Sequence, residues 1–191
     1  MRHLSSRQVL RFAHLSAALS AWHRTQPLRR IEVVDLGIEH GDSGRIAREV
    51  LGPATRVHGC DLWAPFVEVA DRSVYSGLLM RGDARKFLTD DYAGVMDVAF
   101  CCEILEHMPH DDGEKLVKDM IGHLRPGGLI LVTAPFGWMP QGPIDGNPHE
   151  VHVSAWDPVE LEDLGFVTLA VLPEHRLFVS AYTTANVEWR A

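Results

Sequence analysis

The sequence predicts an α/β protein built on a doubly wound, mostly parallel sheet of seven strands, with helices on both faces and a C-terminal antiparallel hairpin. First, strand-like and helix-like segments alternate between residues 31 and 133. Second, the first strand-like segment runs directly into a glycine-rich turn. Third, the strand-like segments 166–172 and 175–184 follow each other too closely for a parallel crossover, so they should pair as an antiparallel hairpin.

Local patterns place the individual elements. Ser5 or Ser6 can cap a helix that runs to about residue 22 and is expected to cover the sheet or the mouth of an active site. Its basic side chains Arg2, Arg7 and Arg11 are interpreted as a solvated face in preference to an anion-binding one. Further strands are expected at 31–35, 55–60, 76–81, 95–101 and 129–133, and further helices at 42–51, 64–71, 84–89, 111–124 and 157–164.

The length of 191 residues suits one sizeable core, so a single domain over residues 1–191 is expected. Its parts are a helical extension at 1–26, a ligand-binding core at 31–134, a loop at 135–156, and a helix with an edge hairpin at 157–191. The loop is rich in glycine and proline and too long for a mere connector. We therefore expect it to be functional.

Composition limits the partners and the compartment. The chain has 18 Lys and Arg against 26 Asp and Glu, a net charge of −8, which disfavours nucleic acid as a partner. Cys60, Cys101 and Cys102 follow apolar runs and resemble small buried hydrophobic residues in a reducing compartment. Long apolar runs and an export signal are not recognised, so a cytoplasmic protein without a membrane partner is expected. The oligomeric state stays open.

The glycine-rich turn is the start of a nucleotide-type cofactor site. Ligands of doubly wound sheets bind beyond the carboxyl ends of the strands. Asp61 follows the turn by the interval at which a carboxylate can accept hydrogen bonds from both ribose hydroxyls, and Asp83 is placed to accept one from an adenine amino group. The expected cofactor-binding residues are Asp35, Gly37, Glu39, Gly41, Asp61, Leu62, Asp83, Ala84 and Cys102.

Several segments resemble the class I S-adenosylmethionine-dependent methyltransferases, over essentially the whole chain after residue 30. They are VVDLGIEHG, GCDLW, MRGDARKF and MDVAFCCEILEHMPHDDGEKLVKDMIGHLRPGGLILVTAP. The resemblance implies a Rossmann-like methyltransferase fold with S-adenosylmethionine as the methyl donor. Glu39 departs from the family pattern, because it replaces the middle glycine of the D-x-G-x-G-x-G loop.

A cluster of acidic residues and histidines is expected beside the donor. Glu103, Glu106 and His107 have the spacing i, i+3, i+4, which places them on one face of a helical turn, and two carboxylates with an imidazole suit a hard cation. His149 and His152 lie in the long loop that should return over the same pocket.

This E-x-x-E-H turn resembles that of divalent-metal-dependent O-methyltransferases. The resemblance implies Mg²⁺ or Mn²⁺ held by Glu103, Glu106, His107 and His152, with His149 as the alternative fourth ligand. A metal-free site is the other reading, in which His107 is the best candidate for a general base and His149 or His152 comes next.

The expected function is S-adenosylmethionine-dependent O-methylation of a small hydroxylated metabolite, with a divalent metal orienting the acceptor in the first reading of the cluster. The alternative is a methyltransferase-fold protein that has lost methyl transfer because of Glu39. It would then be a metal-dependent lyase or isomerase, or a non-catalytic partner. An NAD-dependent dehydrogenase is a third, weaker reading of the glycine loop.

Overall fold

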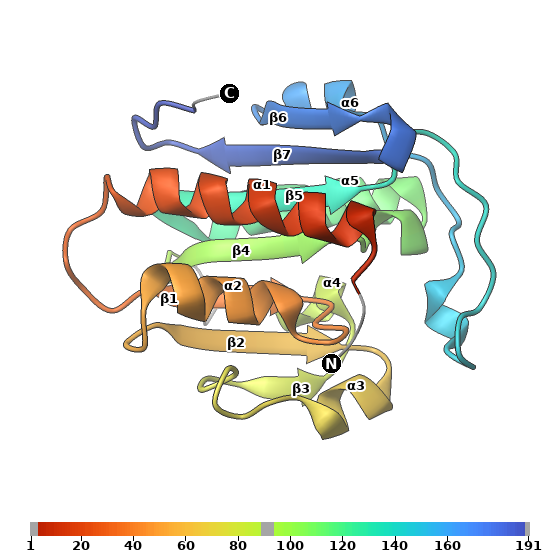
Figure 1. Cartoon of the computed structure of the whole chain (residues 1–191), viewed down its shortest axis with the longest axis horizontal. Helices are drawn as coiled ribbons and strands as arrows, with labels where there is room; N and C mark the ends of the chain where they lie inside the picture. The colour runs from red at the N-terminus through yellow and green to blue at the C-terminus, as the bar shows by residue number, and fades with distance from the viewer. Residues whose placement is uncertain (1–3, 89–93, 190–191) are drawn as a thin grey trace.

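The computed structural model describes residues 4–88 and 94–189 and contains one seven-stranded sheet (Figure 1). The strand order is β3-β2-β1-β4-β5-β7-β6. The strands are β1 (Glu32–Leu36), β2 (Arg56–Asp61), β3 (Leu79–Arg81), β4 (Met96–Cys102), β5 (Leu124–Ala134), β6 (Val167–Leu172) and β7 (Leu177–Thr183). Strands β1 to β5 are parallel, and β7 is antiparallel to both β5 and β6. The predicted doubly wound sheet with its C-terminal antiparallel hairpin is confirmed.

Helices cover both faces of the sheet (Figure 1). The helices are α1 (Ser6–His23), α2 (Asp42–Leu51), α3 (Ala64–Val69), α4 (Ala84–Phe87), α5 (His110–His123) and α6 (Pro158–Glu162). One apolar cluster unites α1, α2 and α3 with one side of the strands, and Trp22 of α1 is fully buried in it. A second cluster unites α4, α5 and α6 with the other side, around Trp156. The sheet is therefore the middle layer of three.

Two strand boundaries differ by three residues or more from those predicted. The strand expected at 76–81 is shortened to Leu79–Arg81. Gly77 lies against the ring of His58, and the N–H of Leu78 donates a hydrogen bond to Nδ1 of that ring instead of to a neighbouring strand. The strand expected at 129–133 already begins at Leu124, which pairs with Met96 ahead of an irregularity in the register. The helix expected at 84–89 ends at Phe87, and the last predicted residue, 89, lies outside the described residues.

The topology creates a switch point at the centre of the sheet. Strand β1 pairs with β2 on one side and with β4 on the other, so the chain winds outward in both directions from β1. The carboxyl ends of the parallel strands meet at one edge, where helix α1 begins and where the loop 135–156 runs (Figure 1). Within the described residues, no helix is both long and apolar enough to cross a membrane.

Candidate active site

A cavity of about 550 Å³ lies at this edge of the sheet. Its walls come from the start of α1, the turns that follow β1, β2, β3 and β4, and the loop 135–156. Such a volume is typical of sites for small molecules. Segments that are distant in the sequence thus share one ligand-sized space at the switch point, as the strand pattern predicts.

Most of the expected cofactor-binding residues line this cavity, namely Gly37, Glu39, Asp61, Leu62, Asp83, Ala84 and Cys102. Asp35 and Gly41 do not line it. Asp35 lies beneath the glycine loop at 1% exposure and accepts a hydrogen bond of 2.6 Å from the hydroxyl of Tyr75. Burial raises the pKa of Asp35 to about 7, against the lowering effect of that hydrogen bond. Asp35 therefore lies behind the cavity wall, where it bonds to Tyr75 and to the backbone of Gly44 at the start of α2.

The loop after β1 keeps a glycine-like backbone without a full set of glycines. Gly37 has φ of 69°, and a Cβ atom there would lie 2.6 Å from Cδ1 of Ile104. Glu39 also adopts a left-handed conformation, with φ of 44°. Glu39 lines the cavity, and its Oε1 lies 3.5 Å from Nε2 of His40. The substitution thus preserves the course of the loop but adds a carboxylate at the cavity wall.

Asp61 is anchored by backbone groups. Its Oδ1 accepts the N–H of Trp63 at 2.8 Å, and its Oδ2 accepts the N–H of Glu39 at 3.0 Å. Burial raises its pKa, while these two hydrogen bonds and the charge of His149 lower it. Each carboxylate oxygen has a second lone pair, so a fixed carboxylate in the cavity wall can still accept hydroxyl donors from a ligand. This geometry fits the ribose contact expected from the sequence.

Asp83 is more constrained than the sequence suggests. Its Oδ1 accepts the backbone N–H of Arg85 at 3.0 Å, and Nε of the same residue lies 3.0 and 3.1 Å from the two carboxylate oxygens. This side-chain hydrogen bonding is the main reason why the pKa of Asp83 is lowered. An adenine amino group would therefore share the carboxylate with Arg85.

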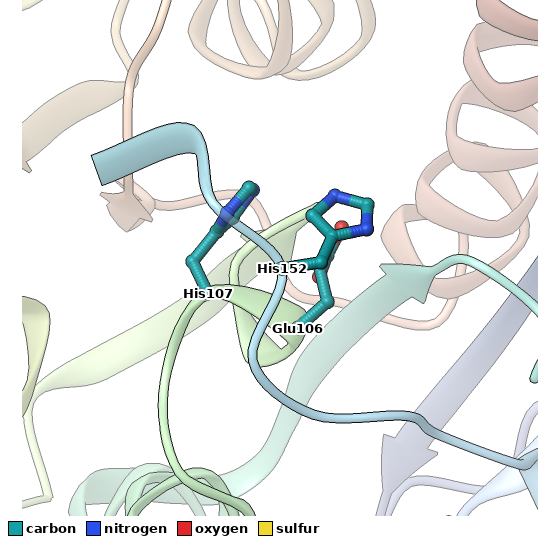
Figure 2. Close-up of side chains that lie close together, drawn as sticks. All are labelled: Glu106, His107 and His152. Carbon is teal, nitrogen blue, oxygen red and sulfur yellow. The ribbon is translucent and has the colours of Figure 1, made fainter. Parts of the chain in front are cut away.

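Three of the predicted acidic residues and histidines come together in the cavity. Glu106 and His107 lie on a short 3-10 helix, Leu105–His107, and His152 lies on the loop 135–156 (Figure 2). One ligand atom from each lies within 4.8 Å of the others. In Figure 2 the two residues of the turn and the one from the loop converge on the same region. The fold thus assembles a potential metal-binding group from two separate segments.

Hydrogen bonds define the tautomers of both imidazoles. Nδ1 of His107 lies 3.2 Å from the carbonyl of Val151, and Nδ1 of His152 lies 2.6 Å from that of Met139. A carbonyl can only accept, so each Nδ1 carries the hydrogen, and Nε2 of the neutral ring keeps a free lone pair. Burial lowers the pKa of His107 to about 4, which keeps this ring neutral near pH 7.

Glu106 is 2% exposed, and among the described residues neither of its carboxylate oxygens has a hydrogen-bond partner. Burial raises its pKa well above the ordinary range, and the charge of Glu103 adds to this effect. A buried carboxylate without a donor is costly. A divalent cation fits this group, because it would balance the carboxylate and accept the imidazole lone pairs.

Glu103 and His149 lie outside this group. Glu103 has φ of 57°, and the helical turn begins only at Leu105, so Glu103 does not share a helical face with Glu106 as the spacing suggested. Its carboxylate accepts a hydrogen bond of 3.0 Å from Oγ1 of Thr133 and forms an ion pair with Arg7. His149 lies near the start of α3, with its ring centroid 6.5 Å from that of Trp63.

Helix α1 contributes to the cavity wall, which agrees with one of its two expected positions, but a solvated face was the preferred interpretation of its arginines. The interpretation of a solvated basic face is wrong for Arg7 and Arg11, which both line the cavity, whereas Arg2 lies outside the described residues. Arg11 is only 6% exposed. The sequence contained a signal for this, because Arg11 stands four and eight residues before the fully buried Leu15 and Leu19, on the same helical stripe.

Comparison with known proteins agrees with this geometry. Residues 33–128 match the family model of the methyltransferase domain. The chain is 32% identical over 105 residues to a ubiquinone biosynthesis O-methyltransferase of Cupriavidus pinatubonensis, covering 53% of this chain and 40% of that protein. It is 30% identical over 103 residues to a trans-aconitate 2-methyltransferase of Azoarcus sp., covering 54% and 38%. The chain thus matches only about two fifths of the length of these curated relatives.

Solved structures of methyltransferases have a similar fold. A crystal structure of a SAM-dependent methyltransferase from Archaeoglobus fulgidus superposes with a TM-score of 0.62 at 17% identity, covering 85% of this chain and 70% of that one. The family match spans half of the chain and contains the glycine loop, Asp61, Asp83 and the Glu106–His107 turn. The chain therefore belongs to the methyltransferase domain family, as a class I S-adenosylmethionine-dependent methyltransferase domain.

Proposed function

We propose that this chain transfers the methyl group of S-adenosylmethionine to an oxygen atom of a small hydroxylated acceptor, next to a divalent cation such as Mg²⁺ or Mn²⁺. The observation that carries the proposal is the single cavity in which the glycine loop and Asp61 face the group formed by Glu106, His107 and His152. The names of the two curated relatives, one of them an O-methyltransferase, are consistent with it.

The donor half of the proposal rests on the β1 and β2 ends. Asp61 would accept the ribose hydroxyls, and Gly37 lines the cavity without a side chain, so the ligand could approach the loop backbone closely. The bound donor supplies an electrophilic methyl group. The residues of this chain would hold it at the cavity wall, with the loop 135–156 on the acceptor side.

The acceptor half rests on the group of Glu106, His107 and His152, which would hold the cation. A divalent cation supplies Lewis acidity, which lowers the pKa of an acceptor hydroxyl. Three protein ligands leave coordination positions for oxygen atoms of the acceptor. The Nδ1 hydrogen bonds to Val151 and Met139 would fix both imidazoles in the tautomer that ligation needs. In the metal-free reading, Nε2 of His107 would instead take the hydroxyl proton.

Donor binding is tested by isothermal titration calorimetry with S-adenosylhomocysteine. Asp61→Ala should weaken binding roughly 100-fold, because it removes two hydrogen bonds to a charged acceptor. Asp163→Ala is the matched control, since Asp163 is exposed after α6 and does not line the cavity. No binding by the unaltered protein would favour the alternative in which methyl transfer has been lost.

Metal binding is tested separately by titration with MnCl₂. Glu106→Gln keeps the shape of the side chain but removes its charge, and it should weaken Mn²⁺ binding at least 10-fold. Glu103→Gln distinguishes the three-residue metal site from the four-residue one, because Glu103 belongs only to the latter. Binding should survive this change if the three-residue group of the structure is the site, and should fail if the four-ligand set implied by the resemblance is correct.

A further inference from the structure

The potential metal-binding group contains one carboxylate, that of Glu106, beside the imidazoles of His107 and His152. An imidazole that offers Nε2 to an ion is neutral, so a divalent cation bound by these three residues would keep an unbalanced positive charge. Glu103 does not balance it, because its carboxylate is paired with Arg7. An unbalanced charge in a largely buried site is unfavourable. A second carboxylate close to the ion would remove this cost.

Glu150 brings a carboxylate next to this group from the loop 135–156. The residue lines the cavity, and its side chain is 25% exposed. Its Oε2 lies 3.9 Å from Nε2 of His107, which is too long for a hydrogen bond. Metal bonds of about 2.1 Å to nitrogen and oxygen place two ligand atoms of one ion about 3–4 Å apart. The separation of Oε2 and Nε2 therefore fits two ligands of the same cation.

The two atoms also carry charge of the same sign. Nδ1 of His107 holds the ring hydrogen, because it lies 3.2 Å from the carbonyl of Val151, so Nε2 presents a lone pair. The oxygen of an ionised Glu150 presents lone pairs as well. Two such atoms repel each other unless a positive charge lies between them. A cation at this point would bind both.

Hydrogen bonds hold Glu150 in place, as they do the two imidazoles. Nδ2 of Asn147 donates to its Oε1 at 3.1 Å, and Nε2 of Gln141 donates to its backbone carbonyl at 2.8 Å. Asn147 is 4% exposed, and its Oδ1 accepts the N–H of His149 at 3.0 Å, which defines the orientation of the amide. Carboxylates that bind metals have such outer partners. Oε2 of Glu150 is then available to an ion.

We infer that Glu150 is a further ligand of the cation and takes the place that the resemblance implies for Glu103. The inference rests on the proposed function, which brings a divalent cation to Glu106, His107 and His152. Glu150 lies beside His107 and outside the set of atoms within 4.8 Å of one another, so the ion would draw its carboxylate inward. The carboxylates of Glu106 and Glu150 would together balance the ion. An octahedral ion would still have positions for oxygen atoms of the acceptor.

The test is a titration of the full chain with MnCl₂, followed by the electron paramagnetic resonance signal of free Mn²⁺. Glu150→Gln keeps the size of the side chain and removes its charge, and it should weaken Mn²⁺ binding roughly 10-fold or more, as should Glu106→Gln. Asp145→Asn is the matched control, because Asp145 is exposed on the same loop and does not line the cavity. It should change the affinity by less than about twofold, since exposed charges are screened.

A second measurement separates direct ligation from a general effect of charge. Glu150→Cys should prefer Cd²⁺ to Mn²⁺, because a thiolate is a soft ligand. The complex should then show the ultraviolet charge-transfer absorption of a Cd²⁺–thiolate bond. The unaltered protein with Cd²⁺ is the blank, because it contains the three native cysteines. Glu39→Gln removes another carboxylate from the cavity wall and measures the effect of charge alone.

A loss of Mn²⁺ affinity in Glu150→Gln that exceeds the loss in Glu39→Gln supports the inference, and so does an equal loss accompanied by the thiolate absorption. An equal loss without this absorption overturns it, because Glu150 would then act through its charge alone. If Glu150→Gln binds Mn²⁺ like the unaltered protein while Glu106→Gln does not, the inference is wrong and the proposed function stands. If the unaltered protein does not bind Mn²⁺, the metal part of the proposed function fails, and the inference fails with it.

Discussion

The backbone N–H of Glu39 donates a hydrogen bond of 3.0 Å to Oδ2 of Asp61. This contact ties the loop after β1 to the end of β2. It also explains how a residue other than glycine is kept at φ of 44°, because the hydrogen bond to Asp61 fixes the loop backbone in this conformation. The position that interrupts the family's glycine pattern thus orients the carboxylate expected to bind the donor.

Glu39→Gly should strengthen donor binding. The change removes a carboxylate from the cavity wall. Burial is the main cause that raises the pKa of Glu150, and the negative charge of Glu39 is the next. We expect the affinity for S-adenosylhomocysteine to rise about 3- to 10-fold, equivalent to roughly 1 kcal/mol, as measured by calorimetry. Glu39→Gln should give most of this gain. Asp145→Gly, at φ of 49° and outside the cavity lining, controls for the backbone effect. Weaker binding by Glu39→Gln would contradict the prediction.

Gly37→Ala should destabilise the protein more than Gly137→Ala. The two glycines have φ of 69° and 67°, so the backbone cost of the added methyl group is similar. At Gly37 the new Cβ atom would lie 2.6 Å from Cδ1 of Ile104, whereas at Gly137 no atom of the described residues, its two chain neighbours aside, lies within 4 Å of the new Cβ. We expect a loss of about 1 kcal/mol for Gly137→Ala and about 2–4 kcal/mol for Gly37→Ala, from strain and overpacking. Urea denaturation measures both, and equal losses would contradict the packing argument.

Asp35→Asn should flatten the dependence of stability on pH. The pKa of Asp35 is raised from 3.8 to about 7 in the folded protein, so the folded state holds a proton that the unfolded chain releases. Its stabilisation is fully present below pH 3.8 and is lost as the pH rises through about 7. Between pH 5 and 7, the free energy of unfolding of the unaltered protein should therefore fall by roughly 2 kcal/mol more than that of the variant.

The measurement is urea denaturation at several pH values. Asp71→Asn is a suitable control, because Asp71 is fully exposed and its pKa is lowered by hydrogen bonds to Ser73. Its titration lies below the pH range of interest. Parallel pH profiles for the unaltered protein and for Asp35→Asn would show that the buried carboxyl does not hold its proton.

Asp97→Ala should separate stability from binding. Asp97 is completely buried at the start of β4, where it accepts two hydrogen bonds from Arg29, at 2.6 and 2.7 Å, and one from the N–H of Glu32. Removing it leaves these donors without their acceptor and should cost about 3 kcal/mol. The affinity for S-adenosylhomocysteine should not change, because the site lies at the other end of the strand. Asp119→Ala, in a partly exposed pair with Lys115, should cost less than 1 kcal/mol.

Much of the fold follows from local sequence. Buried strands such as Met96–Cys102 are apolar apart from Asp97, and the glycine loop with Asp61 and Asp83 marks the carboxyl ends where a ligand binds. Such signals depend on neighbours along the chain, so one sequence is enough to read them. Boundaries were less predictable, as at Leu124, because the start of that strand depends on its pairing with Met96.

The sequence by itself therefore determined the doubly wound sheet, the family and most of the cavity wall. Only the tertiary structure decided that Arg11 is buried in the site and that the carboxylate of Asp83 accepts hydrogen bonds from Arg85. It also decided that Glu103 forms an ion pair with Arg7 and lies outside the group that contains Glu106. The physical reason is that these are long charged side chains. Their positions depend on which charges and carbonyls the fold brings within reach, and residues far apart in the sequence supply those partners.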